Sequence, residues 1–396
     1  MQKTNRGGKI TYDIVIGRTK KDKEKFGLNG TIFLGKHYVQ MGQTTALSNN
    51  VYMDLVRSHV VFVVGKRGSG KSYLLGVITE GLADLPDNIR NNLSIVILDT
   101  MGIFWTMKYP NQKEKHLVEE WNLETKPLDV TICTPLGFYN QAKKEGIPTD
   151  RPFAINPTEL LGSDWATTFG IEENSAPAVL IERIIHDLKE EQETYSLKDI
   201  LDAIEKNEDT DKTTKAAVKN HFIAAQGWGL FSEEGTPLSE LVAPGQVTIV
   251  DISAYSNQEH GWAIKALVTG IISQKLFIDR MQARKEEEFK QVQRDTNYIS
   301  TDYNEVEQEE PLVWLVIDEA HEFLPNQGKT LATDPLVTIL REGRQPGISL
   351  ILASQQPGKI HTDVMTQSDI VISLRITAKL DTDALGMLMQ SYMRTG

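Results

Sequence analysis

The chain has 396 residues and a formal net charge of −12, because 54 acidic side chains outnumber 42 lysines and arginines. Its apolar fraction of 40% is ample for a sizeable core, and its length predicts two or three folding units. No apolar run approaches the ~18 residues of a membrane-spanning helix, and the amino-terminal sequence lacks the apolar segment of a secretory signal. The single cysteine, Cys133, excludes an internal disulfide and a multi-cysteine metal site. These features predict a cytoplasmic protein with no membrane partner.

The charge is unevenly distributed along the chain. Residues 1–40 carry nine basic and three acidic side chains, a net charge of +6, which leaves −18 for the remainder. The negative net charge argues mildly against a protein that coats nucleic acid through bulk charge. The basic residues 1–40 are nevertheless compatible with a local contact to nucleic acid. A second shift lies at 281–311, where acidic residues meet few apolar ones, and it predicts a solvated helix end followed by an acidic linker.

The first 58 residues predict a small β module. Tyr12, Ile14 and Ile16 would share one face of a short strand, and Ile32 and Leu34 would share one face of another. Short alternating runs separated by Gly and Asn are typical of strands joined by turns. Residues 1–58 are therefore expected to form an amino-terminal β module.

From residue 60 onward the pattern changes to continuous apolar runs, which are typical of strands buried on both faces of a parallel sheet. The predicted strands are 60–64, 94–98, 247–250, 312–317, 348–352 and 369–374. Helical patterns at 72–82, 178–191 and 263–281 lie between them, so the fold class is α/β, with a parallel-rich sheet covered on both sides.

A helical stretch divides this α/β core into two parts. The core is expected over 59–155 and 245–396, with 156–244 between them as an all-helical insertion. Amphipathic patterns and Gly or Pro punctuation predict helices at 178–190, 197–206 and 213–226. The many charges of this insertion are interpreted as a solvated helix face.

The strongest motif is a glycine-rich segment that matches G-x-x-x-x-G-K-[ST] directly after the strand 60–64 and at the start of a helix. Its residues are Gly65, Lys66, Arg67, Gly68, Ser69, Gly70, Lys71 and Ser72, followed by Tyr73. Glycines let backbone N–H groups turn around an anion, Lys71 would reach the β and γ phosphates, and the Ser72 hydroxyl would ligate Mg²⁺. The alternative is a glycine-rich turn that binds nothing. The motif is complete and stands between a strand and a helix as it must, so this alternative is disfavoured.

A second motif follows the apolar run 312–317, which ends in Asp318 and Glu319. Ligands of open α/β sheets collect at the carboxyl ends of the strands, where these two carboxylates would lie beside the phosphate loop. We expect Asp318 to hold Mg²⁺ through water and Glu319 to polarise an attacking water, as ATP hydrolysis requires. The alternative is an acidic pair that stabilises a helix amino terminus.

Two further segments carry candidate residues for catalysis. Gln355, after the strand 348–352, is a candidate contact for the γ-phosphate or its attacking water, or else a residue that caps a loop. Arg341 and Arg344 lie on one face at the end of a helix. They either neutralise that helix end and pair with Glu342, or reach across a subunit boundary to stabilise transition-state charge as an arginine finger does.

Four blocks read together carry a resemblance to a known family. They are SHVVFVVGKRGSGKS, LVWLVIDEAHEFL, REGRQPGISLILASQQP and DIVISLRI. The combination resembles the HerA/FtsK clan of ring ATPases, and within it the HerA branch, over roughly residues 50–375. The arginine stretch leading into a strand that ends in Ser-Gln-x-Pro is more discriminating than the two phosphate-site motifs, and so is the Asp-x-x-Gly at 99–102.

The resemblance implies a RecA-like P-loop ATPase core that uses ATP and Mg²⁺ and assembles as a homo-hexameric ring. Such a ring translocates on double-stranded DNA and acts with a NurA-like nuclease or another effector protein in DNA-end processing or defence. Glu319 would be the catalytic carboxylate, Gln355 the γ-phosphate sensor and Arg344 the arginine acting in trans. Arg57, just before the strand 60–64, would be another arginine near the nucleotide.

The chain departs from the family at both ends, with an amino-terminal region shorter than the usual barrel and an early stop after the last strand. Its basic candidates for DNA contact, beyond residues 1–40, are Lys108, Lys113, Lys143 and Lys144, each of which is equally an ordinary surface charge. An ATP-gated ring scaffold for a partner protein and a conjugation- or packaging-type DNA pump are the alternative functions.

Overall fold

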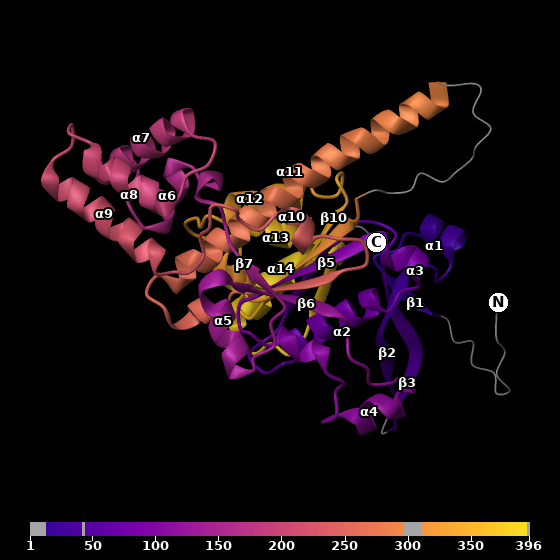
Figure 1. Ribbon diagram of the computed structural model, residues 1–396. Helices are drawn as coiled ribbons and strands as arrows, with labels where there is room; N and C mark the ends of the chain where they lie inside the picture. Colours follow the sequence, from indigo (N-terminus) through magenta and orange to yellow (C-terminus); the bar gives the residue numbers. More distant parts are fainter. Residues whose placement is uncertain (1–12, 42–43, 297–309, 394–396) are drawn as a thin grey trace.

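The structure is a computed structural model that describes residues 13–41, 44–296 and 310–393 (Figure 1). Its amino-terminal part is a three-stranded sheet of β1 (Ile14–Ile16), β2 (Thr31–Met41) and β3 (Thr44–Asp54), in the order β1-β3-β2. The strands expected around residues 14–16 and 32–34 are confirmed, whereas β3 and the helix α1 (Lys20–Phe26) were not predicted. The Thr19 hydroxyl caps α1 by accepting from the Asp22 backbone N–H, which explains a helix among so many lysines.

The core is an eight-stranded sheet in the order β11-β4-β10-β9-β5-β8-β6-β7, in which every pairing is parallel. Its strands are β4 (Val60–Val64), β5 (Leu93–Asp99), β6 (Val130–Pro135), β7 (Arg151–Phe153), β8 (Val247–Asp251), β9 (Leu312–Ile317), β10 (Ile348–Ser354) and β11 (Ile370–Ser373). All six predicted core strands are present. The sheet therefore confirms the α/β fold class with a RecA-like parallel core.

Two core strands, β6 and β7, were not predicted. In β6, threonines interrupt the apolar run and Pro135 ends it, so no continuous pattern is visible. β7 has only three residues and carries Pro152 in its middle. Proline is tolerated there because β7 is the edge strand of the sheet, where one row of backbone N–H groups needs no partner strand.

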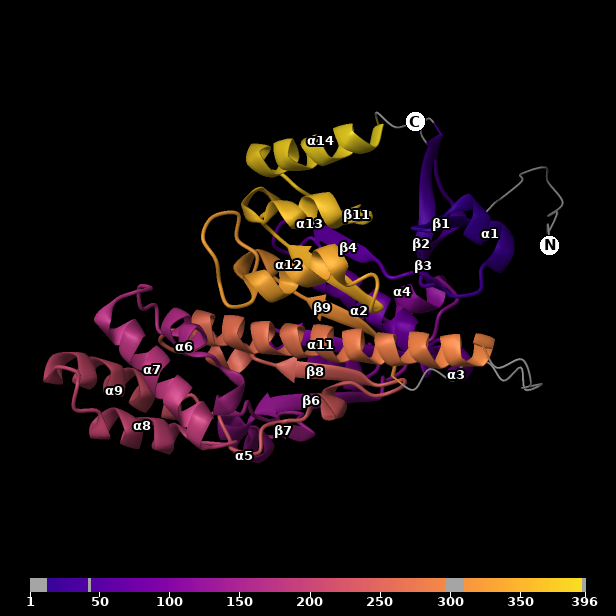
Figure 2. The same ribbon diagram turned by 90° about the horizontal axis from the view of Figure 1, so that it is seen from above.

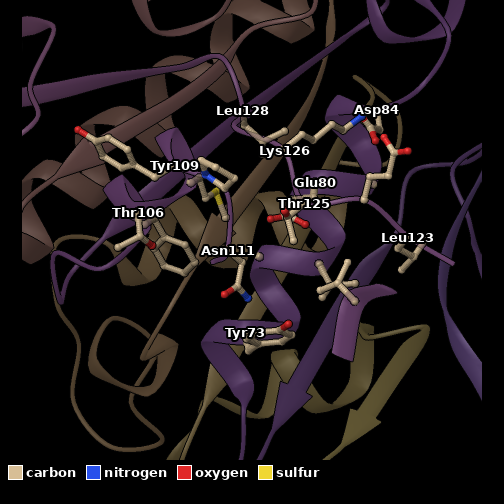
Figure 3. Close-up of a pocket in the computed structure, with 18 of the residues that line it drawn as sticks. Tyr73, Glu80, Asp84, Thr106, Tyr109, Asn111, Leu123, Thr125, Lys126 and Leu128 are labelled. Carbon is tan, nitrogen blue, oxygen red and sulfur yellow. The ribbon is translucent and has the colours of Figure 1, made fainter. Parts of the chain in front are cut away.

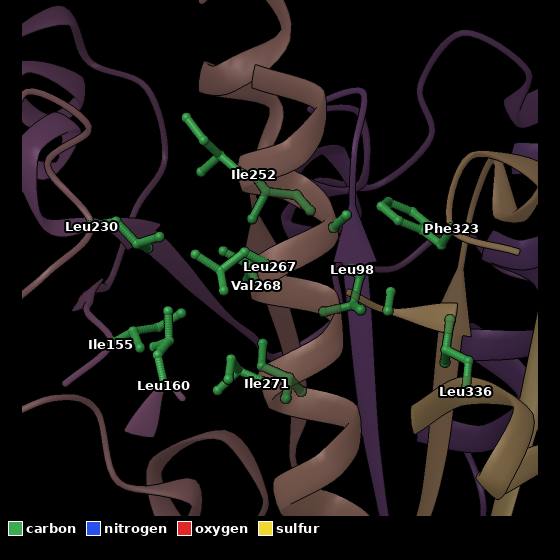
Figure 4. Close-up of a cluster of buried hydrophobic side chains, with 14 of the residues drawn as sticks. Leu98, Ile155, Leu160, Leu230, Ile252, Leu267, Val268, Ile271, Phe323 and Leu336 are labelled. Carbon is green, nitrogen blue, oxygen red and sulfur yellow. The ribbon is translucent and has the colours of Figure 1, made fainter. Parts of the chain in front are cut away.

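Each face of the sheet is covered by its own layer. α2 (Lys71–Ala83) packs on one face, where Trp314 and Val316 of β9 join its core cluster. The alternate β9 residues Val313 and Leu315 face the other layer, which contains α11 (Gly261–Thr296), α12 (Thr333–Glu342) and α13 (Thr362–Gln367). Figure 4 shows Leu98 of β5 and Leu267 and Ile271 of α11 among the buried side chains of this layer. Each such side chain contributes about 1.5–3 kcal/mol by leaving water.

Four helices between β7 and β8 lie together at one end of the molecule, away from the amino-terminal sheet (Figures 1 and 2). They are α6 (Gly162–Thr168), α7 (Ala176–Glu191), α8 (Leu197–Lys206) and α9 (Lys212–Gln226), and the short α10 (Leu238–Leu241) lies near α11 instead. Trp165 is fully buried among Phe169, Phe222 and Phe231, and these rings continue the core cluster that lies under α11. Ser175, Ser196 and Asp211 cap the three longest of these helices, as the sequence pattern requires.

The 36-residue helix α11 runs over the sheet and projects past it (Figure 1). Its Gly261–Lys290 segment is long and apolar enough to cross a membrane by length and composition, but 67% of its most apolar stretch is buried inside the protein, as in a core helix. Residues 281–296 of the expected acidic linker belong to this helix, and residues 297–309 of that linker lie outside the described residues.

The remaining helices connect the strands and complete the outer layers. They are α3 (Asp87–Arg90), α4 (Lys115–Glu120), α5 (Leu136–Glu145) and α14 (Lys379–Met393), with short 3₁₀ helices η1 (Phe104–Lys108), η2 (Pro157–Glu159), η3 (Ser253–Asn257), η4 (Ala320–Glu322) and η5 (Pro357–Lys359). Because all core strands are parallel, their carboxyl ends meet along one edge of the sheet, where the loops after β4, β5, β9 and β10 come together.

Candidate active site

The glycine-rich loop lies at this carboxyl edge, between the end of β4 and Lys71, the first residue of α2. Gly68 and Gly70 adopt φ of 74° and 96°, which favours glycine at both positions. A Cβ on Gly65 would lie 2.3 Å from the Ser69 Oγ, so a side chain there would force the loop apart. The loop is pinned at both sides, because the Gly65 N–H donates to the Ser354 carbonyl and the Lys66 N–H to the Arg375 carbonyl.

This loop fits an anion on three counts. None of the side chains that the structure describes caps the amino terminus of α2, so its first backbone N–H groups remain available to an anion. Lys71 is 94% buried (6% exposed) at this helix start. The Ser69 Oγ is buried and finds no hydrogen-bond partner within the described ranges. Buried polar atoms nearly always have partners, and a phosphate oxygen would supply one.

Two oxygen ligands suited to Mg²⁺ meet beside the loop. The Ser72 hydroxyl donates to Asp318 Oδ2 across 2.8 Å, and Asp318 is almost fully buried at the end of β9. The other carboxylate oxygen accepts from the Glu319 N–H at 2.9 Å. Mg²⁺ is usually held by one or two protein oxygens together with phosphates and water, so this hydroxyl–carboxylate pair fits the ion.

Glu319 is held in an unusual conformation next to this pair. Its backbone is left-handed, with φ of 53°, which is uncommon for a residue other than glycine. Burial raises the pKa of its carboxyl to about 7, helped by the negative Asp318 and opposed by Lys71. Gln355 Nε2 donates to Glu319 Oε1 across 2.5 Å. A general base is most effective when its pKa lies near the working pH, so Glu319 suits the activation of a water molecule.

The structure thus brings Lys71, Ser72, Asp318, Glu319 and Gln355 together from α2, β9 and β10. Gln355 contacts Glu319 rather than only capping its loop, so its amide lies beside the candidate carboxylate. The phosphate loop and the two strand ends, which are separated from it by more than 200 residues, thus meet at the carboxyl edge as the two sequence motifs imply.

Tyr73 lies in the wall of a cavity of about 1100 Å³ next to the loop (Figure 3). Its ring is 57% exposed, and Ser72 lines the same cavity. The cavity follows α2 from this end to Asp84 and Lys126, which form an ion pair at the far end. Tyr73 is therefore placed where a group attached to the phosphates has room.

Arg57 is not brought to the phosphate loop. It precedes β4 at the amino edge of the sheet, whereas the loop follows β4 at the carboxyl edge. There its guanidinium binds both carboxylate oxygens of Asp22 in α1, at 2.8 and 3.1 Å. The structure therefore gives Arg57 a role in attaching the amino-terminal part to the core, in place of the nucleotide contact expected from the resemblance.

Arg341 and Arg344 also lie at the amino edge, around the end of α12 and before β10. Arg341 forms an ion pair with Asp363 of α13 at 2.7 Å, which is neither the helix-end contact nor the Glu342 pairing considered from the sequence. Arg344 is exposed and makes no ion pair within the part of the chain that the structure describes. The seven residues of β10 separate Arg344 from Gln355 by about 20 Å, so Arg344 cannot reach the phosphate loop of its own subunit.

Two buried polar residues lie beside the site, of which the sequence marked Asp99 only as part of a family pattern and gave no signal for Lys265. Asp99, at the end of β5, accepts backbone N–H bonds from Met101, Gly102, Ile103 and Phe104 and thereby shapes the loop next to Asp318. Burial raises the pKa of Asp99 to about 6, with those N–H bonds opposing the shift. Lys265 of α11 is buried and donates to the Thr100 carbonyl at 2.9 Å. The Asp-x-x-Gly pattern marked Asp99, whereas a lysine in an amphipathic helix gives no signal of burial.

The predicted DNA-contacting lysines have mixed surroundings. Lys108 forms an ion pair with Asp150 at 2.6 Å, and the Lys143 ammonium lies 4.3 Å from the centre of the Tyr139 ring. Lys113 lines the cavity along α2. Residues 1–12 of the basic amino-terminal region lie outside the described residues.

A family match and two related proteins all assign the chain to the same family. Residues 32–271 match the family described as the central domain of helicase HerA. The chain is 22% identical over 345 residues to the DNA double-strand break repair helicase HerA of Pyrococcus furiosus, covering 83% of this chain and 58% of that protein. It is 33% identical over 148 residues to a probable helicase of the same description from Methanocaldococcus jannaschii, covering 35% of this chain and 27% of the relative. The chain thus spans little more than half the length of these relatives at most.

A solved structure shares the fold. VirB4 of Thermoanaerobacter pseudethanolicus superposes with a TM-score of 0.52 at 14% identity, covering 91% of this chain and 88% of that one. At this identity the likeness concerns the fold alone, and it agrees with a parallel sheet built around a phosphate loop.

Proposed function

The chain belongs to the family of the HerA helicase central domain, and on this premise we propose that it is an Mg²⁺-dependent ATPase that translocates on double-stranded DNA. The observation that carries the proposal is the convergence of the phosphate loop, the Ser72–Asp318 pair and the Glu319–Gln355 pair at one edge of the sheet. A nucleotide-binding site without hydrolysis needs no buried carboxylate poised near neutral pH.

Each residue has a defined task in hydrolysis. Lys71 and the N–H groups of the loop bind the phosphates, and Ser72 and Asp318 would hold Mg²⁺, which when bound neutralises phosphate charge. Glu319 orients the attacking water and accepts its proton. Gln355 holds one oxygen of that carboxylate in place and lies close enough to respond to the phosphate beside it. Tyr73, in the cavity wall, is placed to contact the nucleoside.

The position of Arg344 supports an assembly in which subunits complete each other's sites. An exposed arginine about 20 Å from its own phosphate loop cannot act there within its own subunit, but it is accessible to the site of a neighbouring subunit. Such an arginine stabilises transition-state charge and is worth about 10³- to 10⁵-fold in turnover in other nucleotide hydrolases. We therefore assign Arg344 as the residue acting in trans in a ring of identical subunits, with six as the number implied by the resemblance.

The mixing experiment uses Arg341 as a matched control, because Arg341 already binds Asp363 within its own chain. Arg344→Ala subunits keep an intact phosphate loop and Lys71→Ala subunits keep an intact Arg344, so each variant should be inactive alone. If Arg344 acts in trans, mixing the two should restore ATP turnover, because a Lys71→Ala neighbour supplies Arg344 to the site of an Arg344→Ala subunit. Arg341→Ala alone should keep turnover close to wild type. No recovery of turnover on mixing would contradict the assignment in trans.

DNA-dependence separates translocation from the alternatives. Phosphate release is measured with and without duplex DNA over a range of salt concentrations. A translocase should be stimulated by duplex DNA, and the stimulation should weaken as salt rises because phosphate contacts release counterions. ATP turnover that no nucleic acid changes would favour the ATP-gated scaffold for a partner protein, consistent with the acidic bulk of the chain.

A NurA-like nuclease or another effector as partner belongs to the same proposal, and a pull-down with the purified effector tests it.

A further inference from the structure

The second carboxylate oxygen of Glu319 faces a histidine that has no role in the mechanism above. Glu319 Oε2 lies 3.5 Å from Nδ1 of His321, and the two side chains are 10% and 14% exposed, respectively. Each of these two atoms is buried and lacks a hydrogen-bond partner among the residues that the structure describes. The other oxygen, Oε1, accepts from Gln355 on the opposite side.

The histidine is carried by a rigid turn. His321 is the middle residue of η4, which Glu319 precedes as the capping residue, and the Glu322 N–H donates to the Glu319 carbonyl at 2.9 Å. The following Phe323 is fully buried and stacks on Trp262, with ring centres 5.4 Å apart. The backbone that carries His321 is therefore held in place next to Glu319 by this turn and by the packing of Phe323.

The surroundings of His321 favour its neutral imidazole, which can donate one hydrogen bond. Burial lowers the pKa of His321, and the neighbouring Lys359 and Lys71 lower it further. A neutral imidazole carries one N–H, and the hydrogen bond that it makes decides which nitrogen holds it. With the proton on Nδ1, His321 can donate to Glu319 Oε2 after an approach of about half an ångström, which brings the pair to ordinary N–H···O length.

We propose that His321 is a positioning residue for Glu319, which donates from Nδ1 to Oε2 and, with Gln355 on Oε1, brackets the carboxylate. A carboxylate oxygen has two lone-pair positions, so Oε2 can accept from His321 and still accept the proton of the attacking water. The bracket fixes the direction of that second lone pair. This inference rests on the proposed ATPase function.

Three substitutions test which atom of His321 matters. His321→Phe keeps a flat ring without a donor, His321→Asn places an amide N–H near the position of Nδ1, and His321→Gln places it near Nε2. His321→Phe should lower kcat for ATP about 10- to 100-fold, the scale of a small misplacement of a catalytic group, with KM within about twofold of wild type. His321→Asn should restore kcat to within about fivefold of wild type, and His321→Gln should stay close to the Phe variant. The matched control is His186→Phe, because the His186 side chain is 73% exposed on α7.

Several outcomes overturn the proposal. A His321→Phe enzyme with wild-type kcat, or equal losses in the Asn and Phe variants, excludes a donor at Nδ1. In a Glu319→Gln background, His321→Phe should cause no further loss in single-turnover rate, and an additional loss of the same size would show that His321 acts independently of Glu319. If the Phe variant melts far below wild type, the Asn–Gln pair decides alone, since both are amides and only the donor position differs. A wild-type enzyme that binds ATP without releasing phosphate would instead contradict the proposed function itself.

Discussion

The two edges of the parallel sheet both carry buried charged and polar groups, but around the amino-terminal sheet these groups are paired, whereas beside the phosphate loop several lack partners among the described residues. At the amino edge, buried Asp54 binds Arg18 and His59, His59 also binds Asp369, and Arg57 binds Asp22. At the carboxyl edge, Ser69 Oγ, Glu319 Oε2 and His321 Nδ1 are buried and lack hydrogen bonds within the described ranges.

This difference separates structural charges from functional ones. The paired groups connect residues around the amino-terminal sheet with one another and with the core, whereas Ser69 Oγ is available to a ligand and Glu319 Oε2 and His321 Nδ1 lie close to each other. Unpaired buried groups cost stability, and proteins keep them mainly where activity requires them. Substitutions of these paired groups at the amino edge should therefore change stability without changing ATP turnover, and substitutions at the phosphate site should do the reverse.

The largest expected effect is on turnover, from Lys71→Ala at the carboxyl edge. Loss of the ammonium should lower kcat/KM for ATP by at least about 100-fold, because electrostatic stabilisation of phosphate charge is lost. The melting temperature without nucleotide should stay within a few degrees of wild type, because no ion pair of Lys71 is present in the described part of the chain. Wild-type ATP turnover in this variant would place catalysis elsewhere.

The largest effect on stability should come from Asp54→Asn at the amino edge. Asp54 is fully buried between Arg18 and His59, so removing its charge leaves two buried cations without their carboxylate. Breaking a buried ion pair costs about 3–5 kcal/mol of unfolding free energy, which urea titration can measure. ATP affinity under native conditions should equal that of wild type, and a parallel loss of ATP binding would show that the two edges are not independent.

His59 makes the stability of the amino edge depend on pH. Burial alone would lower the pKa of His59, but the carboxylates of Asp369 and Asp54 outweigh it and raise the pKa to about 9 from 6.5. The protonated form therefore contributes stability that is fully present below about pH 6.5 and is lost as the pH rises through about 9, up to about 3 kcal/mol. Unfolding free energy measured across this window should fall for wild type, and His59→Gln should remove most of that slope. A slope that the variant retains would have to come from other groups.

The smallest effect should come from Arg57→Ala. The Arg57 side chain is 45% exposed in its pair with Asp22, and exposed pairs contribute little to stability. The melting temperature should fall slightly, and KM for ATP should be unchanged within error. A raised KM would restore the nucleotide contact that the sequence resemblance implies.

The sequence predicted the parts of the site that depend on local pattern. The phosphate loop, the Asp318–Glu319 pair and six core strands follow from continuous apolar runs and fixed spacings, and their positions agree with the structure. The limits of the four expected domains remain predictions, although α7, α8 and α9 begin and end within two residues of the expected helices.

What the sequence could not supply depends on tertiary contacts. Arg57 was expected near the nucleotide, but which edge of the sheet it faces is decided by Asp22, a residue 35 positions earlier. The burial of Lys265 and the approach of His321 to Glu319 depend on how α11 and η4 pack on the sheet. The strands β6 and β7 were missed because threonine and proline interrupt their apolar pattern, which pairing in the sheet tolerates.

The most direct test of the carboxyl edge as a hydrolytic site is Mg²⁺-dependent phosphate release by wild type and Glu319→Gln, with nucleotide binding measured on the same samples. Glu319→Gln removes the water-activating carboxylate and keeps its shape and its contact with Gln355. We expect both proteins to bind ATP with similar affinity, and we expect kcat to fall at least about 100-fold in the variant. Turnover in Glu319→Gln within a few-fold of wild type would contradict the account.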